Sequence, residues 1–171
     1  VVLVQLAARA SVAACEADPA GAFATNVDAV AATVTEVGRW ARSCSLPLRV
    51  VYVSTGHVYA AAEPGLRLTE AAPTGPRSVY ARTKLAAESA VEAACGEAEA
   101  SLVVARVFGL VAPTQPDWYV LPALIARVRR GDVQGIPGLA SVRDYLDARD
   151  VCDVLLMLAT VTLDALVDLG R

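Results

Sequence analysis

The chain has 171 residues, a length that predicts one domain with room for a substantial core. Hydrophobic residues make up 56% of it, yet no apolar run reaches the roughly 18–20 residues needed to span a bilayer, so we expect no membrane helix. A net charge of −3 argues against a nucleic-acid partner. Four scattered cysteines and one histidine indicate buried free thiols in a reducing cytoplasm, and no metal site.

Apolar runs alternate with segments of helical spacing along the chain. The predicted strands are 1–8, 49–54 and 101–106. The predicted helices are about 21–43, 78–95, 118–130 and 148–159, with a short one from Leu163 to Leu169. Loops are expected at 9–20, 61–77 and 107–117, and a loop with a short strand at 132–147. Strands that alternate with helices predict an α/β fold, a parallel sheet with helices on both faces.

Two motifs between residues 50 and 84 carry the chemistry. The apolar, β-branched run 50–53 ends in Ser54 and Thr55, as a buried parallel strand does when it delivers polar groups at its carboxyl end. Tyr80 and Lys84 follow, four residues apart in a predicted helix, so they lie one turn apart on one face. The spacing therefore predicts that a phenol, an ammonium and a hydroxyl meet at one end of the sheet.

This set of groups suits proton transfer. A free phenol, with a pKa of about 10, is a poor base near neutrality, and we expect the Lys84 ammonium to lower the pKa of Tyr80. Thr55, or Ser54 beside it, would hold a substrate carbonyl or alcohol against the phenol for an alcohol/ketone interconversion. Lys84 is the one lysine among 15 basic residues, which favours a position where a compact ammonium matters.

The chain resembles the extended short-chain dehydrogenase/reductases, and more narrowly the NAD(P)-dependent nucleotide-sugar epimerase/dehydratase/reductase group. The segments that carry the resemblance are 54–59 (STGHVY), 80–84 (YARTK), Leu6-Ala7-Ala8, Asp18-Pro19, Thr25-Asn26-Val27, 106–109 (RVFG) and 142–151 (VRDYLDARDV). Gln5 and Gly109 stand where the family has His and Asn. The resemblance implies an incomplete Rossmann-like sheet at 1–110, with part of a small C-terminal substrate-binding region at 111–171.

The resemblance also implies a role for each matching residue. Thr55, Tyr80 and Lys84 would be catalytic. NAD or NADP would contact Leu6, Ala7, Ala8, Arg9, Asn26, Ser54, Tyr80, Lys84 and Phe108. A nucleotide-sugar substrate would contact Thr55, Gly56, His57, Gly109 and Arg143, whose guanidinium suits a diphosphate. A homodimer through the helices at about 21–43 and 78–95 is expected. Gly56-His57 replaces the carboxylate pair of the dehydratase branch, which argues against a 4,6-dehydratase and leaves epimerase and 4-keto reductase open.

One element that the family requires is missing from the 171 residues. They contain no GxGxxG turn, the motif that brings a backbone close to a pyrophosphate. We therefore expect a fragment, the ordered part of a longer protein or a degenerate paralogue, which would not bind NAD(P) tightly by itself. A deletion between about 159 and 162 is also expected. The alternatives to an enzyme are a catalytically silent binding or regulatory module, an inactive fragment, or a structural domain of a larger assembly.

Overall fold

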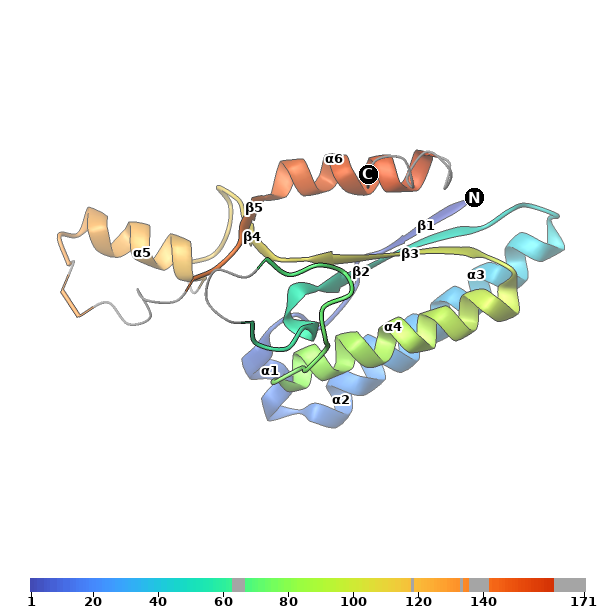
Figure 1. The fold of residues 1–171 in the computed structure, drawn as a ribbon, viewed down its shortest axis with the longest axis horizontal. Helices are drawn as coiled ribbons and strands as arrows, with labels where there is room; N and C mark the ends of the chain where they lie inside the picture. The colour runs from blue at the N-terminus through green and yellow to red at the C-terminus, as the bar shows by residue number, and fades with distance from the viewer. Residues whose placement is uncertain (63–66, 118, 133, 136–141, 162–171) are drawn as a thin grey trace.

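A three-stranded parallel sheet forms the centre of the molecule (Figure 1). The computed structural model describes residues 1–62, 67–117, 119–132, 134–135 and 142–161. The strand order is β1 (Val2–Gln5), β2 (Arg49–Thr55), β3 (Ser101–Val107), with β2 in the middle. Val51 of β2 lies opposite Val4 and Val103. All three strands therefore end at the same edge, where the polar residues after β2 are placed.

Helices cover both faces of this sheet, and a second, two-stranded parallel sheet joins β4 to β5 (Figure 1). The helices are α1 (Val12–Ala17), α2 (Pro19–Phe23), the π-helical turn η1 (Ala24–Asp28), α3 (Ala29–Ser43), the 3-10 turn η2 (Gly56–Val58), α4 (Val79–Ala98), α5 (Val120–Arg129) and α6 (Ala148–Thr160). The short strands are β4 (Gly109–Val111) and β5 (Tyr145–Asp147). In Figure 1, α3 and α4 lie on one side of the sheet, α6 lies on the other, and α5 extends away from it.

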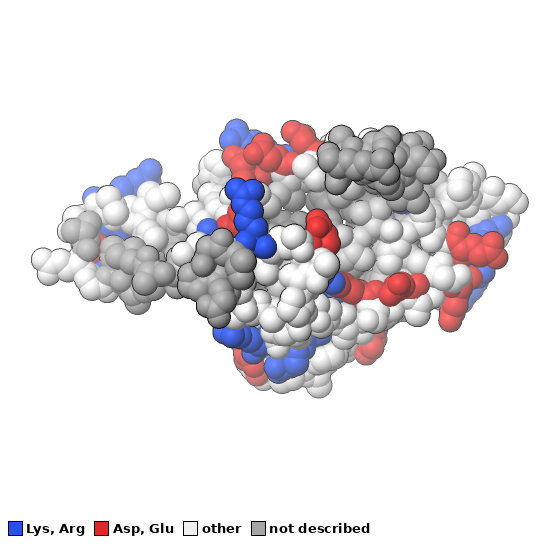
Figure 2. Space-filling view, viewed as in Figure 1, with Lys and Arg blue, Asp and Glu red and all other residues white. Residues whose placement is uncertain are grey.

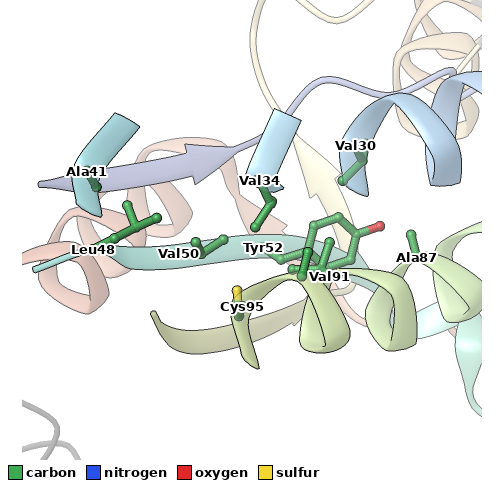
Figure 3. Packing of buried hydrophobic residues seen from close by; sticks show 10 residues of the cluster. Val30, Val34, Ala41, Leu48, Val50, Tyr52, Ala87, Val91 and Cys95 are labelled. Atoms are coloured by element: carbon green, nitrogen blue, oxygen red, sulfur yellow. The ribbon is translucent and has the colours of Figure 1, made fainter. Parts of the chain in front are cut away.

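The main core lies between β2 and the helix pair α3 and α4 (Figure 3). Alternate residues of a strand point to opposite faces, so Val50 and Tyr52 face the helix pair, where Val34 of α3 and Val91 of α4 are also fully buried. Val51 is buried on the other face, which α6 covers. Packing on both faces of the sheet fixes the position of β2 and therefore the position of Thr55 at its carboxyl end.

The predicted Rossmann-like α/β architecture is confirmed, with two local corrections. The segment 9–20 is not a loop: it contains α1 and the start of α2. The Ser11 side chain caps α1 by accepting from Ala14 N, and the Asp18 side chain caps α2 by accepting from Gly21 N, with Pro19 in the first turn. The segment 107–117 is also more than a loop, because it contains β4.

Three further expectations concern the surface and the chain end. The cysteines are unpaired, but only Cys15 and Cys95 are buried, whereas Cys44 and Cys152 are exposed. Within the described residues, no helix has the length and apolarity needed to cross a membrane. Acidic and basic side chains are interspersed on the face shown in Figure 2. The predicted helix from Leu163 to Leu169, and the far side of the expected deletion near Thr160, lie outside the described residues.

Candidate active site

The carboxyl end of β2 places Thr55 at the centre of the site. Thr55 is the last residue of the strand and is 7% exposed. Its side-chain oxygen accepts a hydrogen bond from His57 N at 3.3 Å, so it caps η2. The exposed His57 ring meets the Tyr80 ring edge to face, with 6.2 Å between centroids. The strand end and the first turn of α4 therefore meet, as the spacing of the two motifs predicts.

Tyr80 lies in the first turn of α4, whose start is fixed by Ser78. The Ser78 hydroxyl accepts a hydrogen bond from Ala81 N at 3.1 Å, which is the usual N-cap interaction. The Tyr80 side chain is half-buried and packs against Cys15 and Val79. Burial raises the pKa of Tyr80 above the ordinary value of 10.0, while a hydrogen bond with the Thr55 side chain partly opposes that rise.

Lys84 points beneath β2 and is only 3% exposed. Its Nζ donates to the Val53 carbonyl oxygen at 2.6 Å and lies 4.3 Å from the centroid of the Tyr52 ring. Desolvation lowers the pKa of Lys84 from 10.5 to about 8, and the charge of Glu88 acts against this shift. The one lysine of the chain therefore places a buried amine near the carboxyl end of β2, the strand that carries Thr55.

The expectation that Lys84 lowers the pKa of Tyr80 is wrong for this structure. The two residues do lie on successive turns of α4, but the ammonium bonds to the backbone of Val53 rather than reaching toward the phenol. Burial dominates at Tyr80, so its pKa is raised instead of lowered. The phenol consequently stays protonated near neutral pH.

Ser54 does not share the environment of Thr55. Its hydroxyl donates to Glu88 Oε1 at 2.5 Å, and Glu88 is 8% exposed. Both carboxylate oxygens of Glu88 also accept hydrogen bonds from Arg106, from Nε at 3.0 Å and from Nη2 at 2.6 Å. This fork joins α4 to the carboxyl end of β3.

Two aromatic rings form a wall beside Thr55. Tyr59 and Phe108 stack with 6.3 Å between centroids, and the Arg106 guanidinium lies 4.9 Å from the centre of the Tyr59 ring. The Phe108 ring lies directly against Gly56, where an added Cβ would come within 2.6 Å of it. A side chain at position 56 would therefore displace the wall, which accounts for the glycine after Thr55.

Asn26 is 1% exposed and has three hydrogen bonds within the chain. Its Oδ1 accepts from Arg9 N at 2.7 Å, and its Nδ2 donates to Arg9 O at 3.1 Å and to Thr83 Oγ1 at 3.0 Å. It lies in the π-helical turn η1, a distortion that is frequent at functional sites. Asn26 thus ties the segment after β1 to α4, beside Lys84.

The segment that Asn26 holds opens on a cavity. Ala7, Ala8 and Arg9 follow β1, and a hollow of about 490 Å³ is lined by them together with Gln5, Thr25, Ala29, Val30 and Thr33. Leu6 is 62% exposed at the same strand end. Small side chains and a fixed backbone leave room for a ligand to approach closely.

The two remaining predicted residues lie near β4 and β5. Gly109 pairs with β5 so closely that an added Cβ would come within 2.9 Å of Asp144 O, and its N–H donates to that oxygen at 3.1 Å. This contact explains glycine in place of the family's Asn. Arg143 is exposed in the irregular segment just before β5. The structure thus gathers Thr55, Gly56, His57, Tyr80, Lys84 and Phe108 at one edge, with Arg143 at the smaller sheet.

Sequence reasoning missed Glu88 and Thr83. Thr83 immediately precedes Lys84, and its hydroxyl both accepts from Asn26 Nδ2 and donates to Tyr80 O at 2.8 Å. Glu88 follows Lys84 by four residues, so the helical spacing already placed it on the same face of α4. That spacing was the available signal for Glu88, whereas nothing in the sequence pointed to Thr83.

A Rossmann-like sheet with a Thr–Tyr–Lys set at its carboxyl edge defines the class of fold and site. The sequence model of the "NAD dependent epimerase/dehydratase family" matches residues 1–165. The chain belongs to this family, and the resemblance read from its motifs is confirmed.

Relatives with a stated activity match part of the chain. A dTDP-6-deoxy-L-talose 4-dehydrogenase (NAD(P)(+)) of Kitasatospora kifunensis is 31% identical over 119 residues, covering 66% of this chain and 37% of the relative. A GDP-6-deoxy-D-mannose reductase of Pseudomonas aeruginosa is 35% identical over 116 residues, covering 63% and 38%. The chain thus spans under two fifths of the length of these relatives.

Solved structures share the fold over nearly the whole chain. The structure of RMD from Pseudomonas aeruginosa complexed with NADPH has a TM-score of 0.77 and 28% sequence identity, and the match covers 93% of this chain and 56% of that one.

Proposed function

We propose that this chain supplies the catalytic part of an NAD(P)-dependent oxidoreductase that reduces the 4-keto group of a nucleotide-linked sugar. The observation that carries the proposal is that the buried Thr55 and Lys84 and the half-buried Tyr80 lie together at the carboxyl edge of the sheet. The two relatives named above act on 6-deoxyhexoses linked to dTDP or GDP, which supports the reductase reading over an epimerase.

Tyr80 is the proton donor of the proposed reaction. Reduction of a ketone requires a proton on the carbonyl oxygen as the hydride reaches the carbon. A phenol whose pKa is raised by burial keeps that proton at neutral pH, in the form that a general acid needs. Thr55, which shares a hydrogen bond with Tyr80, orients the same carbonyl oxygen from the other side.

The residues present fit the nicotinamide end of NAD or NADP. Ala7, Ala8 and Arg9 line the cavity next to the strand end, and their backbone is fixed by Asn26. The Lys84 ammonium donates one N–H to Val53 O, and its other N–H groups can donate to a ribose hydroxyl. When bound, the cofactor supplies the hydride. We assign Phe108, whose ring lies against Gly56, to the cofactor side of the site as well.

The substrate side is assigned to Gly56, His57, Gly109 and Arg143. His57 is exposed beside Tyr80, where it can contact a sugar hydroxyl without acting as the acid. Arg143 is exposed and carries the fork geometry that binds a diphosphate. The nucleotide itself is left open, since the two relatives use different ones.

We also infer a homodimer through the outer faces of α3 and α4. Trp40 on α3 is 52% exposed, and the two helices pack side by side (Figure 1). Light scattering of the parent and of Trp40→Glu tests this, with a dimer expected for the parent and a monomer for the variant.

The exposed and unpaired thiols of Cys44 and Cys152 support a location in a reducing compartment, the cytoplasm.

The test is turnover by the complete gene product. The protein is incubated with NADPH or NADH and a dTDP-linked or GDP-linked 4-keto-6-deoxyhexose, and the sugar is followed by NMR. We expect stoichiometric formation of the C4 alcohol and oxidised cofactor. Binding of the cofactor without any turnover would instead support a silent binding module. Interconversion of the two C4 epimers of the corresponding C4 alcohol, offered with oxidised cofactor and without net reduction of it, would support an epimerase.

A further inference from the structure

Glu88 is the only acidic side chain that is buried among the described residues, and the proposed chemistry does not use it. Its carboxylate accepts hydrogen bonds from the Ser54 hydroxyl and from Nε and Nη2 of Arg106, so these partners come from the carboxyl ends of β2 and β3. It also lies one helical turn beyond Lys84 on the same face of α4. A buried carboxylate at such a junction calls for an explanation beyond packing, because burial of a charge is costly.

We propose that Glu88 is a positioning residue for the reaction: it balances the buried charge of Lys84 and holds the carboxyl ends of β2 and β3 in place around Thr55. This inference rests on the proposed function for its catalytic meaning. The physical coupling between Glu88 and Lys84 stands on the geometry of α4 and can be measured without any turnover.

The first consequence concerns which hydroxyl serves the substrate. Ser54 and Thr55 are adjacent, and the sequence left the choice between them open. The Ser54 proton is committed to Glu88 at 2.5 Å, a charge-assisted hydrogen bond. Thr55 has no such commitment to a carboxylate and interacts with Tyr80. Glu88 therefore removes Ser54 from the reacting pair and leaves Thr55 as the orienting hydroxyl.

The second consequence concerns the charge of Lys84. The groups that act on its amine are the Val53 carbonyl and the Tyr52 ring from β2 and, on α4, Glu88; Tyr80 acts on Tyr52. Glu88 is also ion-paired with Arg106, whose positive charge opposes the effect of the Glu88 carboxylate on Lys84. Neither tyrosine is ionised near neutrality, because burial raises both of their pKa values. Glu88 is thus the negative charge that favours an ammonium at position 84.

Lys84 can be observed directly, because lysine labelled with carbon-13 gives one side-chain signal per lysine, and the signal of Lys84, the one lysine of these 171 residues, is the signal that Lys84→Met removes. The complete gene product is labelled, and the Lys84 Cε shift is titrated in the parent and in Glu88→Gln. We expect a midpoint near 8 in the parent and a downward shift of about one pH unit in Glu88→Gln. The matched control is Glu92→Gln, an exposed glutamate one turn further along α4, which should leave the midpoint in place.

The direction of the shift separates this role from simple structural damage. A loosened site would let water reach Lys84 and move its midpoint up toward 10.5, whereas loss of the carboxylate charge moves it down. Should Glu88→Gln fail to fold, Arg106→Gln gives a second reading, since freeing Glu88 from its guanidinium should raise the midpoint. Arg106→Lys, which loosens the fork but keeps the positive charge, is its control and should leave the midpoint in place. An unchanged or raised midpoint in folded Glu88→Gln, or an unchanged or lowered one in Arg106→Gln, overturns the proposal. An inactive protein with the predicted shifts would reject the proposed function alone.

Discussion

Replacing Lys84 with methionine should make the protein more stable near neutral pH while it removes activity. Burial lowers the pKa of Lys84 from 10.5 to about 8, and that difference corresponds to about 3 kcal/mol of unfavourable free energy for the charged, folded form. Methionine has a similar length and no charge to desolvate. It loses the hydrogen bond to Val53 O, which we set at about 1–2 kcal/mol.

The net gain for Lys84→Met near neutral pH is therefore about 1–2 kcal/mol in the free energy of unfolding. Its pH dependence has a definite sign. Between about 8 and 10.5 the unfolded chain holds a proton on Lys84 that the folded chain has released, so the parent gains stability from this group as pH rises through that window. The advantage of methionine should accordingly shrink above pH 8 and reverse.

Urea denaturation of both proteins, at neutral pH and again above the pKa of Lys84, measures this difference. Subtracting the variant from the parent cancels the contributions of Cys15, Cys95 and Tyr80, whose raised pKa values lower the stability of both proteins at alkaline pH. A methionine variant that is less stable than the parent at neutral pH, with a difference that does not vary with pH, would refute the reasoning.

Four other substitutions probe the same site. Lys84→Arg keeps the charge but places a larger, planar group in a space that leaves the lysine 3% exposed, so we expect turnover to fall at least tenfold and the protein to lose about 1–3 kcal/mol, measured by steady-state kinetics and urea denaturation. Asn26→Ala should cost about 2–4 kcal/mol, because it leaves both backbone groups of Arg9 without their partner; a loss below the error of a thermal melt would show that the clamp is dispensable. Thr55→Ala should reduce turnover much more than Ser54→Ala, and equal kinetic losses would contradict the assignment of Thr55.

Most of the architecture could be predicted because its signals are local. The β-branched run of β2 and the helical spacing of α3 and α4 each fall within one segment, and so does the Tyr80–Lys84 spacing. The early helices were missed although their signals were present: Ser11 and Asp18 are caps, and a run rich in alanine hid the apolar periodicity after them. β4 was missed for a different reason, since its pairing partner β5 lies far along the chain.

The sequence predicted that Thr55, Tyr80 and Lys84 would lie together at the end of the strand, but it did not predict their electrostatics. Motif spacing placed Tyr80 and Lys84 on one side of α4, but the direction of the amine depends on Val53 O and the Tyr52 ring, which only the folded sheet brings near. The pKa of Tyr80 depends on how deeply the ring is buried, and no local pattern encodes that depth. Glu88 could be predicted in part: its spacing of four residues from Lys84 placed it on the same face of α4, but the sequence did not indicate its partners on β2 and β3.

The pH–rate profile of ketone reduction, recorded for the parent and for Tyr80→Phe in the complete gene product, tests the central claim most directly. With Tyr80 as the acid, turnover should be sustained through neutral pH and fall as pH rises through the raised pKa of the phenol. Tyr80→Phe should be inactive across the whole range, with its fold and cofactor binding retained. A phenylalanine variant that reduces the ketone at the parent rate and with the parent profile would contradict the account.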